Sequence, residues 1–246
     1  MYGWRGRIGH ASPSLGHMLV YEFYLMAPEG TMILSTTGTV RDLSDEQLET
    51  QIQAIEAQAV DLVDSGAQVV MIGGNPVFTR LGPGNEHVIL DPIREKVGVP
   101  VSAHIIAEIS ALRTLGVHKV VLASPFEEPL YRRMAHYLTE SGFEVVNSGG
   151  LGIRHNADID QLPEYASYRL AKRLYYETPE ADGILITCPR WPTVEHIEML
   201  EQETGKPAVS SATAFTWHAL SLLHIHEAIE GFGELLLGLE TPPEAD

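Results

Sequence analysis

The feature that most constrains the fold is an approximate internal repeat of short buried strands, turns and helices. One copy runs from the apolar residues 69–72 through a turn at Gly74 and a helical stretch to Gly98-Val99-Pro100 and a second strand. The other copy runs from residues 183–186 through a turn at Cys188 and a helical stretch to Gly205-Lys206-Pro207. The intervals differ, so the repeat is approximate. It predicts two similar lobes whose turns at Gly74 and Cys188 face each other across a cleft, where open α/β sheets bind ligands.

Short β-branched runs alternate with longer helical patterns along most of the chain, which is typical of parallel α/β sheets. Strands are predicted at residues 7–8, 31–35, 69–73, 100–101, 119–123, 144–147, 183–187 and 207–210, and helices near 44–65, 89–96, 102–115, 127–141, 165–177, 192–204 and 212–223. The first helix is bounded by a capping box at Ser44 and Gln47 and by Gly66. The predicted fold class is therefore α/β, with two pseudo-symmetric lobes, each a mainly parallel sheet flanked by helices. We expect residues 1–115 with 212–246 to form the first lobe and residues 116–211 the second, with the active site in the cleft between them.

Charge and composition argue against several classes of function. Sixteen Lys and Arg residues stand against 33 Asp and Glu residues, a formal net charge of −17, which disfavours binding to nucleic acid or to an anionic membrane. A hydrophobic content of 44% allows a full core, while the longest apolar run is far short of the ~20 residues of a membrane span. The first residues lack the pattern of a secretory signal. We therefore expect a globular cytoplasmic protein that binds neither nucleic acid nor membranes, and a homo-oligomer is compatible with the sequence.

The single cysteine, Cys188, directly follows a predicted strand, at the edge where α/β proteins place functional groups. One interpretation is an inert buried thiol, because free cysteine is among the most buried residue types. The other is a functional thiol whose pKa is lowered by the N-terminus of the next helix, suggested by Trp191-Pro192-Thr193. Such a thiol can act as proton donor, base or nucleophile.

Four short motifs together resemble the aspartate/glutamate racemase superfamily, and are most similar to its branch of arylmalonate decarboxylases and maleate isomerases. They are Arg7-Ile8-Gly9 followed by Pro13, Gly150-Leu151-Gly152-Ile153, Thr187-Cys188-Pro189, and Pro207-Ala208-Val209-Ser210-Ser211 followed by Trp217. The resemblance runs from about residue 7 to about residue 220. It implies a two-lobed pseudo-symmetric α/β fold, and proton transfer at the carbon next to a carboxylate without a cofactor.

The resemblance also implies roles for the two facing positions. Racemases and isomerases of the superfamily use two cysteines, one from each lobe, whereas its decarboxylases keep only the second. Here Gly74 stands at the first position and Cys188 at the second, which implies a decarboxylase of a substituted malonate-like acid with Cys188 as proton donor. Two alternatives stay open: a maleate isomerase-like cis–trans isomerase or racemase-like enzyme with Cys188 as nucleophile, and a non-catalytic relative that binds carboxylates.

The chain departs from the pattern of the family where the decarboxylases hold their enediolate. Asn75 and Pro76 replace a Thr-Ser pair, Phe126 replaces a tyrosine, and Pro189 follows the cysteine, so hydroxyl and backbone N–H donors are lost. These losses argue against an arylmalonate as the substrate and leave a small carboxylate or dicarboxylate. The expected substrate-binding residues are Pro13, Ser14, Gly74, Asn75, Pro76, Phe126, Pro189, Ser210 and Ser211, with Ser124, His155, Asn156 and Arg190 as further candidates.

The eleven histidines do not predict a metal site. His224 and His226 are two residues apart on a predicted helix, so they point to different sides of it. No His-Glu-x-x-His motif or calcium-binding loop is present in the sequence. We therefore expect neither a metal ion nor a cofactor.

Overall fold

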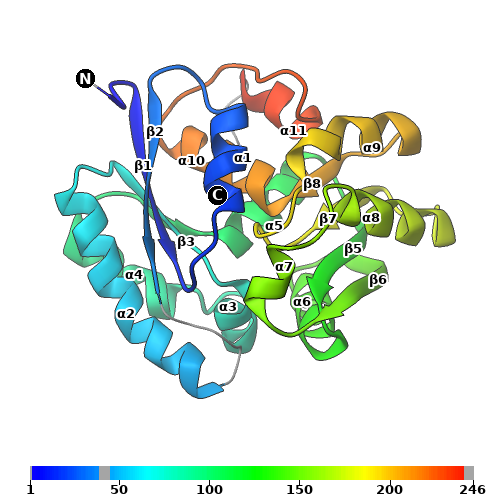
Figure 1. Cartoon of the computed structure of the whole chain (residues 1–246), viewed down its shortest axis with the longest axis horizontal. Coiled ribbons are helices and arrows are strands. Elements are labelled where there is room, and N and C mark those ends of the chain that lie inside the picture. Colours follow the sequence, from blue (N-terminus) through cyan, green and yellow to red (C-terminus); the bar gives the residue numbers. More distant parts are fainter. Residues whose placement is uncertain (1, 39–44, 241–246) are drawn as a thin grey trace.

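A computed structural model of the chain contains two four-stranded sheets with the same strand order (Figure 1). The structure describes residues 2–38 and 45–240, with the backbone alone for residues 45–53 and 240. The first sheet has the order β2-β1-β3-β4 and the second the order β6-β5-β7-β8. The strands of the first sheet are β1 (Gly6–Ser12), β2 (Thr31–Thr37), β3 (Val69–Ile72) and β4 (Val101–Ala103). Those of the second sheet are β5 (Lys119–Phe126), β6 (Glu144–Ile153), β7 (Gly183–Ile186) and β8 (Ala208–Ser210).

All neighbouring strands in both sheets run parallel. Strands β1 to β4 therefore correspond in order to strands β5 to β8, and the pair β3 and β4 corresponds to the pair β7 and β8. This is the repeat that the sequence predicts, and the α/β fold class with two pseudo-symmetric halves is confirmed. Strands β3 and β7 are buried on both faces along their whole length, which explains why each reads as a continuous apolar run.

Helices connect the strands and cover both sheets. They are α1 (Met18–Met26), α2 (Asp45–Asp64), α3 (Asn75–Leu81), α4 (His87–Val97), α5 (His104–Thr114), α6 (Glu128–Glu140), α7 (Asn156–Ile159), α8 (Ala166–Glu177), the 3-10 helix η1 (Val194–His196), α9 (Ile197–Thr204), α10 (Ser211–Leu222), α11 (Glu234–Leu237) and the 3-10 helix η2 (Gly238–Glu240). In Figure 1, α2 and α4 lie on one side of the first sheet, and α1 and α10 lie on the other. Over residues 2–38 and 45–240, no helix is both long enough and apolar enough to cross a membrane.

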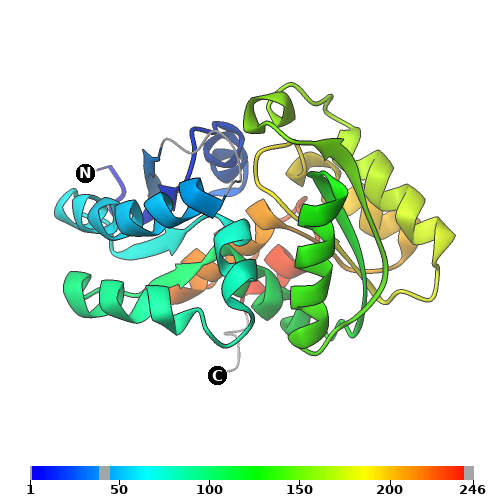
Figure 2. The same cartoon turned by 90° about the horizontal axis from the view of Figure 1, so that it is seen from below.

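Helix α10, orange in Figure 2, starts near the centre of the molecule and runs along the first half. It packs against α5, α1 and β3 of the first half and against β8 of the second. We retain the division into residues 1–115 with 212–246 and residues 116–211 as a proposal, which the contacts of α10 with α1 and β3 support.

Every predicted strand and every predicted helix except one has a counterpart in the structure, with shifted boundaries. Strand β1 continues to Ser12 and β6 to Ile153, both well beyond the predicted ends. The helix predicted from residue 192 begins as η1 at Val194 and becomes α-helical at Ile197. Helices α1, α3, α7 and α11 were not predicted. The predicted helix at residues 224–226 is wrong, because α10 ends at Leu222. The predicted cap at Ser44 lies outside the described residues.

Candidate active site

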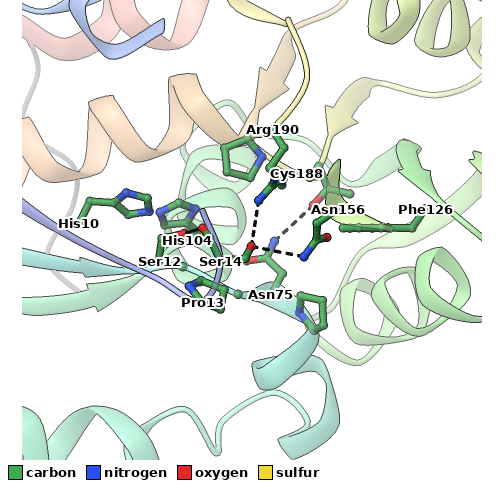
Figure 3. A pocket seen from close by; sticks show the side chains of 15 residues that line it. His10, Ser12, Pro13, Ser14, Asn75, His104, Phe126, Asn156, Cys188 and Arg190 are labelled. Carbon is green, nitrogen blue, oxygen red and sulfur yellow. Dashed lines mark hydrogen bonds between the residues drawn. The ribbon is translucent and has the colours of Figure 1, made fainter. Parts of the chain in front are cut away.

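A pocket opens where the carboxyl ends of the central strands of both sheets meet (Figure 3). Its empty volume is about 630 Å³, part of it open to solvent. The segments that follow β1 and β3 line one side, and the end of β5 and the segment that follows β7 line the other. The lining residues are His10, Ser12, Pro13, Ser14, Gly73, Gly74, Asn75, Pro76, His104, Phe126, Asn156, Thr187, Cys188, Pro189 and Arg190. This is the edge at which open parallel sheets bind their ligands.

Gly74 and Cys188 occupy corresponding turns of the two halves. Gly74 follows β3 and Cys188 follows β7, and both adopt the left-handed backbone region, with φ of 96° and 78°. Glycine adopts this conformation without cost, whereas for cysteine it costs about 1–2 kcal/mol. The turn at Cys188 is anchored by the Trp191 indole N–H, which donates to the carbonyl oxygen of Thr187 at 3.0 Å. Backbone strain in an observed outlier of this kind is most common at functional sites.

The Cys188 side chain is buried, with 6% of its surface exposed. Burial raises the pKa of its thiol to about 12, although a hydrogen bond from the Arg190 backbone N–H and the Arg190 charge act in the opposite direction. The interpretation that a helix N-terminus lowers the pKa of Cys188 is therefore wrong for this structure. The nearest following helix, η1, begins only at Val194. The thiol consequently stays protonated at neutral pH.

A polar cluster around Ser14 joins the segment after β1 to the second half. Arg190 Nη1 donates to Ser14 Oγ at 2.9 Å and to the carbonyl oxygen of Leu15, and Asn156 Nδ2 donates to the same Ser14 Oγ at 3.3 Å. Arg190 Nη2 also pairs with Asp160 at 2.5 Å. Because Ser14 Oγ accepts two hydrogen bonds, its own hydrogen is available for donation to a ligand.

Glu108 on α5 lies fully buried behind the pocket. Its carboxyl oxygens accept hydrogen bonds from Asn75 Nδ2 at 3.0 and 2.9 Å, from Thr187 Oγ1 at 3.4 Å and from Ser211 Oγ. Burial raises the pKa of Glu108 to about 7, against the lowering effect of these hydrogen bonds. One carboxyl group thus connects the residue after Gly74 with the residue before Cys188.

His10 and His104 form a stacked pair at one end of the pocket, with ring centroids 5.1 Å apart. Burial lowers the pKa of His10 to about 4 and that of His104 well below its ordinary value, so both rings are neutral at neutral pH. Neither was among the residues predicted for the site, and neither was Thr187, Ser12, Gly73 or Glu108. His104 lay within the helix predicted at residues 102–115, whereas in the structure it directly follows β4, which ends at Ala103.

The structure brings most of the predicted site residues together. Those that line the pocket are Pro13, Ser14, Gly74, Asn75, Pro76, Phe126, Asn156, Cys188, Pro189 and Arg190. Ser124 borders a smaller adjoining cavity, and its Oγ accepts the Phe126 N–H.

Three other predicted residues line neither of these two cavities. Ser210 forms a capping box with Thr213 at the start of α10, and Ser211 donates to Glu108 behind the pocket wall. His155 is exposed and precedes α7. Within residues 2–38 and 45–240, no group of three or more His, Cys, Asp or Glu side chains could hold a metal ion.

Comparison with known proteins identifies the family. The family model described as arylmalonate decarboxylase matches residues 15–236. The chain belongs to the arylmalonate decarboxylase family. Arylmalonate decarboxylase of Bordetella bronchiseptica is 26% identical over 215 residues, which cover 87% of this chain and 89% of that protein. Maleate isomerase of Nocardia farcinica is 26% identical over 208 residues, which cover 82% of each chain.

Solved structures from both groups share the fold of this family member. A mutant of the Nocardia farcinica maleate cis–trans isomerase with a covalently bound succinylcysteine intermediate matches with a TM-score of 0.85 and 23% identity, over 94% of this chain and 98% of that chain. A liganded double mutant of arylmalonate decarboxylase matches with a TM-score of 0.87 and 24% identity, over 94% and 98%. The predicted resemblance is confirmed, and the chain is an enzyme of the decarboxylase-like lyase or isomerase type.

Proposed function

We propose that this enzyme is a decarboxylase of a small malonate-like diacid, in which Cys188 donates the proton that replaces the departing CO₂. The observation that carries this proposal is a single thiol facing a glycine. Cys188 is the only cysteine in the sequence, and Gly74 stands at the corresponding turn of the other half. A racemase needs an acid and a base on opposite faces of one carbon, whereas protonation of an enediolate needs one donor on one face.

The surroundings of Cys188 support the role of an acid. Cleavage of the bond between the α-carbon and one carboxylate releases CO₂ and leaves the electron pair in an enediolate of the retained carboxylate. The Cys188 S–H then gives its proton to the α-carbon, and the resulting thiolate recovers a proton from water. Since burial raises the pKa of Cys188 to about 12, the thiol carries the proton that this step requires. Ser14, whose hydroxyl group accepts a hydrogen bond from Arg190, lies in the pocket lining and can donate its own hydrogen to the retained carboxylate.

The second candidate is a maleate isomerase in which Cys188 adds to the double bond as a nucleophile. The observation in its favour is that the Nocardia farcinica maleate isomerase is as similar in sequence as the decarboxylase, at 26% identity. Nucleophilic addition needs the thiolate form. Burial of Cys188 opposes ionisation, which favours the decarboxylase.

The decisive experiment incubates the enzyme with substituted malonates and with maleate, and measures CO₂ release and fumarate formation in parallel. We expect CO₂ release by the wild type and a loss of about 1,000-fold or more in Cys188→Ser, because a serine hydroxyl is a far weaker acid than a thiol. The control is His155→Ala, which should be unchanged because His155 is exposed and outside the pocket lining. Fumarate formation from maleate without CO₂ release would establish the isomerase instead, and full turnover by Cys188→Ser would place the chemistry elsewhere.

A further inference from the structure

The Asn75 side chain carries an unsatisfied buried atom at the pocket. Its Nδ2 donates to both oxygens of Glu108 and to Thr187 Oγ1, at 3.0, 2.9 and 3.3 Å. Its Oδ1 is buried and has no hydrogen-bond partner among the described residues. A buried polar atom left without a partner costs about 1–3 kcal/mol, so this arrangement calls for an explanation.

The orientation of the Asn75 amide is also unsuited to an anionic ligand. With Nδ2 turned to Glu108, the remaining amide atom is Oδ1, which is an acceptor and repels a carboxylate. A half-turn of the amide would exchange the two atoms, so that Nδ2 could donate to the ligand and Oδ1 would meet Glu108. In that orientation Asn75 Oδ1 and an ionised Glu108 oxygen, which are both acceptors, would face each other. If Glu108 carries a proton, its O–H donates to Asn75 Oδ1 instead.

Glu108 is placed to gain such a proton. It lies on α5, its side chain is fully buried, and burial raises its pKa to about 7. Ser211, the first residue of α10, and Thr187, which follows β7, also donate hydrogen bonds to the carboxyl group. The carboxyl group is therefore held in place while its protonation state changes.

We propose that Glu108 is a positioning residue that decides which amide atom of Asn75 faces the substrate. Binding of a carboxylate transfers one proton from solvent to Glu108 and turns the Asn75 amide by half a turn, so that Nδ2 donates to a carboxylate oxygen. No covalent bond other than the O–H bond of Glu108 forms, and the proton returns to solvent when the product leaves. The inference rests on the proposed function only in taking the ligand to be a small carboxylate.

Other titratable groups lie on the elements packed around Glu108. They are His104 on α5 itself, His10 on β1, Cys188 after β7, Tyr137 on α6, His218 on α10 and Arg80 on α3. Burial lowers the pKa of both stacked histidines and raises the pKa of Cys188 and Tyr137. His218 Nε2 is bonded to Ser102 Oγ at 2.9 Å. Arg190 is paired with Asp160.

A matched control exists at Glu22 on α1. Burial also raises the pKa of Glu22 to about 7, but its carboxyl group accepts from Thr193 and Val194 and does not line the pocket. Glu22→Gln therefore removes a buried carboxyl group of similar pKa without touching Asn75.

The test is isothermal titration of malonate into the full-length Cys188→Ala protein, which binds without turnover, and into the wild type. Titrations at several pH values between about 7 and 9, in imidazole and in Tris, yield the number of protons taken up from the dependence of the heat on the ionisation enthalpy of the buffer. We expect an uptake close to one proton per malonate near pH 8, and an affinity that falls roughly tenfold per pH unit above about pH 7. Glu108→Gln should remove both the uptake and the pH dependence of the affinity.

Two further variants keep the test decisive if Glu108→Gln folds poorly. Asn75→Leu removes the amide while leaving Glu108 intact, and should also abolish proton uptake, whereas Glu22→Gln should retain it. Uptake that persists in Glu108→Gln or in Asn75→Leu overturns the proposal, as does a complete absence of malonate binding to the wild type. Proton uptake without CO₂ release from any malonate would leave the inference standing while the proposed function fails. CO₂ release without uptake would do the reverse.

Discussion

Cys188 combines a strained backbone with a thiol that resists ionisation. Its φ of 78° is unusual for a residue with a Cβ, and burial raises its pKa to about 12. The turn at Cys188 aims the side chain into the pocket while the neighbouring Trp191 holds the backbone from behind. Strain of this kind persists only where the surrounding structure enforces it. The environment therefore favours an acid over a nucleophile at this position.

The raised pKa of Cys188 predicts slow alkylation in the native protein. With a pKa of about 12, the thiolate fraction at pH 8 is roughly a thousandfold below that of an exposed thiol with a pKa near 8.5. Mass spectrometry after timed exposure to iodoacetamide should show labelling slower by about this factor than in the denatured protein. The labelling rate of the native protein should still be rising at about pH 10. A plateau of the native rate below pH 9 would show that the thiol is activated, as the sequence alone suggested.

Gly74 allows a test of the single-thiol argument. A Cβ added there would lie 3.1 Å from Pro13 Cγ, and φ is 96°, so Gly74→Cys should destabilise the protein by about 1–2 kcal/mol. The corresponding turn at Cys188 shows that a cysteine can adopt this conformation. We expect Gly74→Cys to gain racemising activity toward the chiral product, measured by chiral chromatography, and to lose decarboxylation.

The contact with Pro13 supplies a control for the Gly74 variant. Pro13→Ala in combination with Gly74→Cys removes the Cγ contact and should recover part of the lost stability. The double variant should still decarboxylate more slowly than Pro13→Ala alone, because the second thiol remains. If Gly74→Cys shows no racemisation in either background, a second thiol is not what separates the two reactions.

At the scale of the elements, helix α1 shows where sequence reasoning ends. Strands β3 and β7 were found because burial on both faces makes each a continuous apolar run. The buried face of α1 has helical spacing at Leu19, Glu22, Phe23 and Met26, but its exposed face carries further large apolar and aromatic side chains. The contrast between the faces that marks an amphipathic helix is therefore missing.

The same limit applies to the site. Residues that directly follow the predicted strands, such as Ser14, Asn75 and Cys188, could be assigned to a pocket because strand ends meet at one edge. Glu108 and Glu22 could not be found in this way. Glu108 meets Thr187 across 79 positions of sequence, and Glu22 meets Thr193 across 171. Such contacts depend on how the halves pack, which no local pattern encodes.

Glu22 fixes the segment between Cys188 and α9 by accepting hydrogen bonds at the start of η1, as a capping side chain would. Its Oε1 accepts the backbone N–H groups of Thr193 at 2.5 Å and Val194 at 3.0 Å, and its Oε2 accepts Thr193 Oγ1 at 3.0 Å. Glu22→Ala leaves these buried donors without a partner, so we expect a loss of about 2–3 kcal/mol in urea unfolding and a marked fall in turnover. Glu22→Gln keeps one acceptor oxygen and should lose less than half as much. Equal losses in both variants would show that the charge of Glu22, rather than its hydrogen bonds, matters.

At the scale of the whole molecule, several hydrogen bonds bind the segment after β7 to the first half, and three of them come from different residues of that segment. Asn75 meets Thr187, Arg190 meets Ser14, and Glu22 meets Thr193. The reactive segment is thus positioned from outside its own sheet, and separation of the halves would break all three contacts together. The catalytic geometry and the packing of the halves are therefore one cooperative property.

Four buried titratable groups make the stability of the molecule depend on pH in two opposing ways. Burial raises the pKa of Glu22 and Glu108 from 4.5 to about 7, so the folded state binds more protons than the unfolded state and stability is lost as the pH rises through this range. Burial lowers the pKa of His10 from 6.5 to about 4 and that of His104 well below 6.5, so stability is lost as the pH falls below 6.5. Two groups act in each direction over nearly the same range, and their effects largely cancel.

Removal of one of these groups should expose the dependence that the wild type conceals. In Glu108→Gln only one carboxyl group still offsets the two histidines, so the free energy of unfolding should rise with pH between about 4.5 and 6.5, by roughly 3 kcal/mol relative to the wild-type curve. Urea unfolding at pH 5, 6 and 7 measures this difference directly, because exposed groups titrate alike in both proteins. Glu22→Gln should produce a slope of the same sign. Parallel curves for the wild type and Glu108→Gln would mean that Glu108 is ionised throughout this range. Its pKa would then be too low for Glu108 to be the group that takes up a proton when a carboxylate binds.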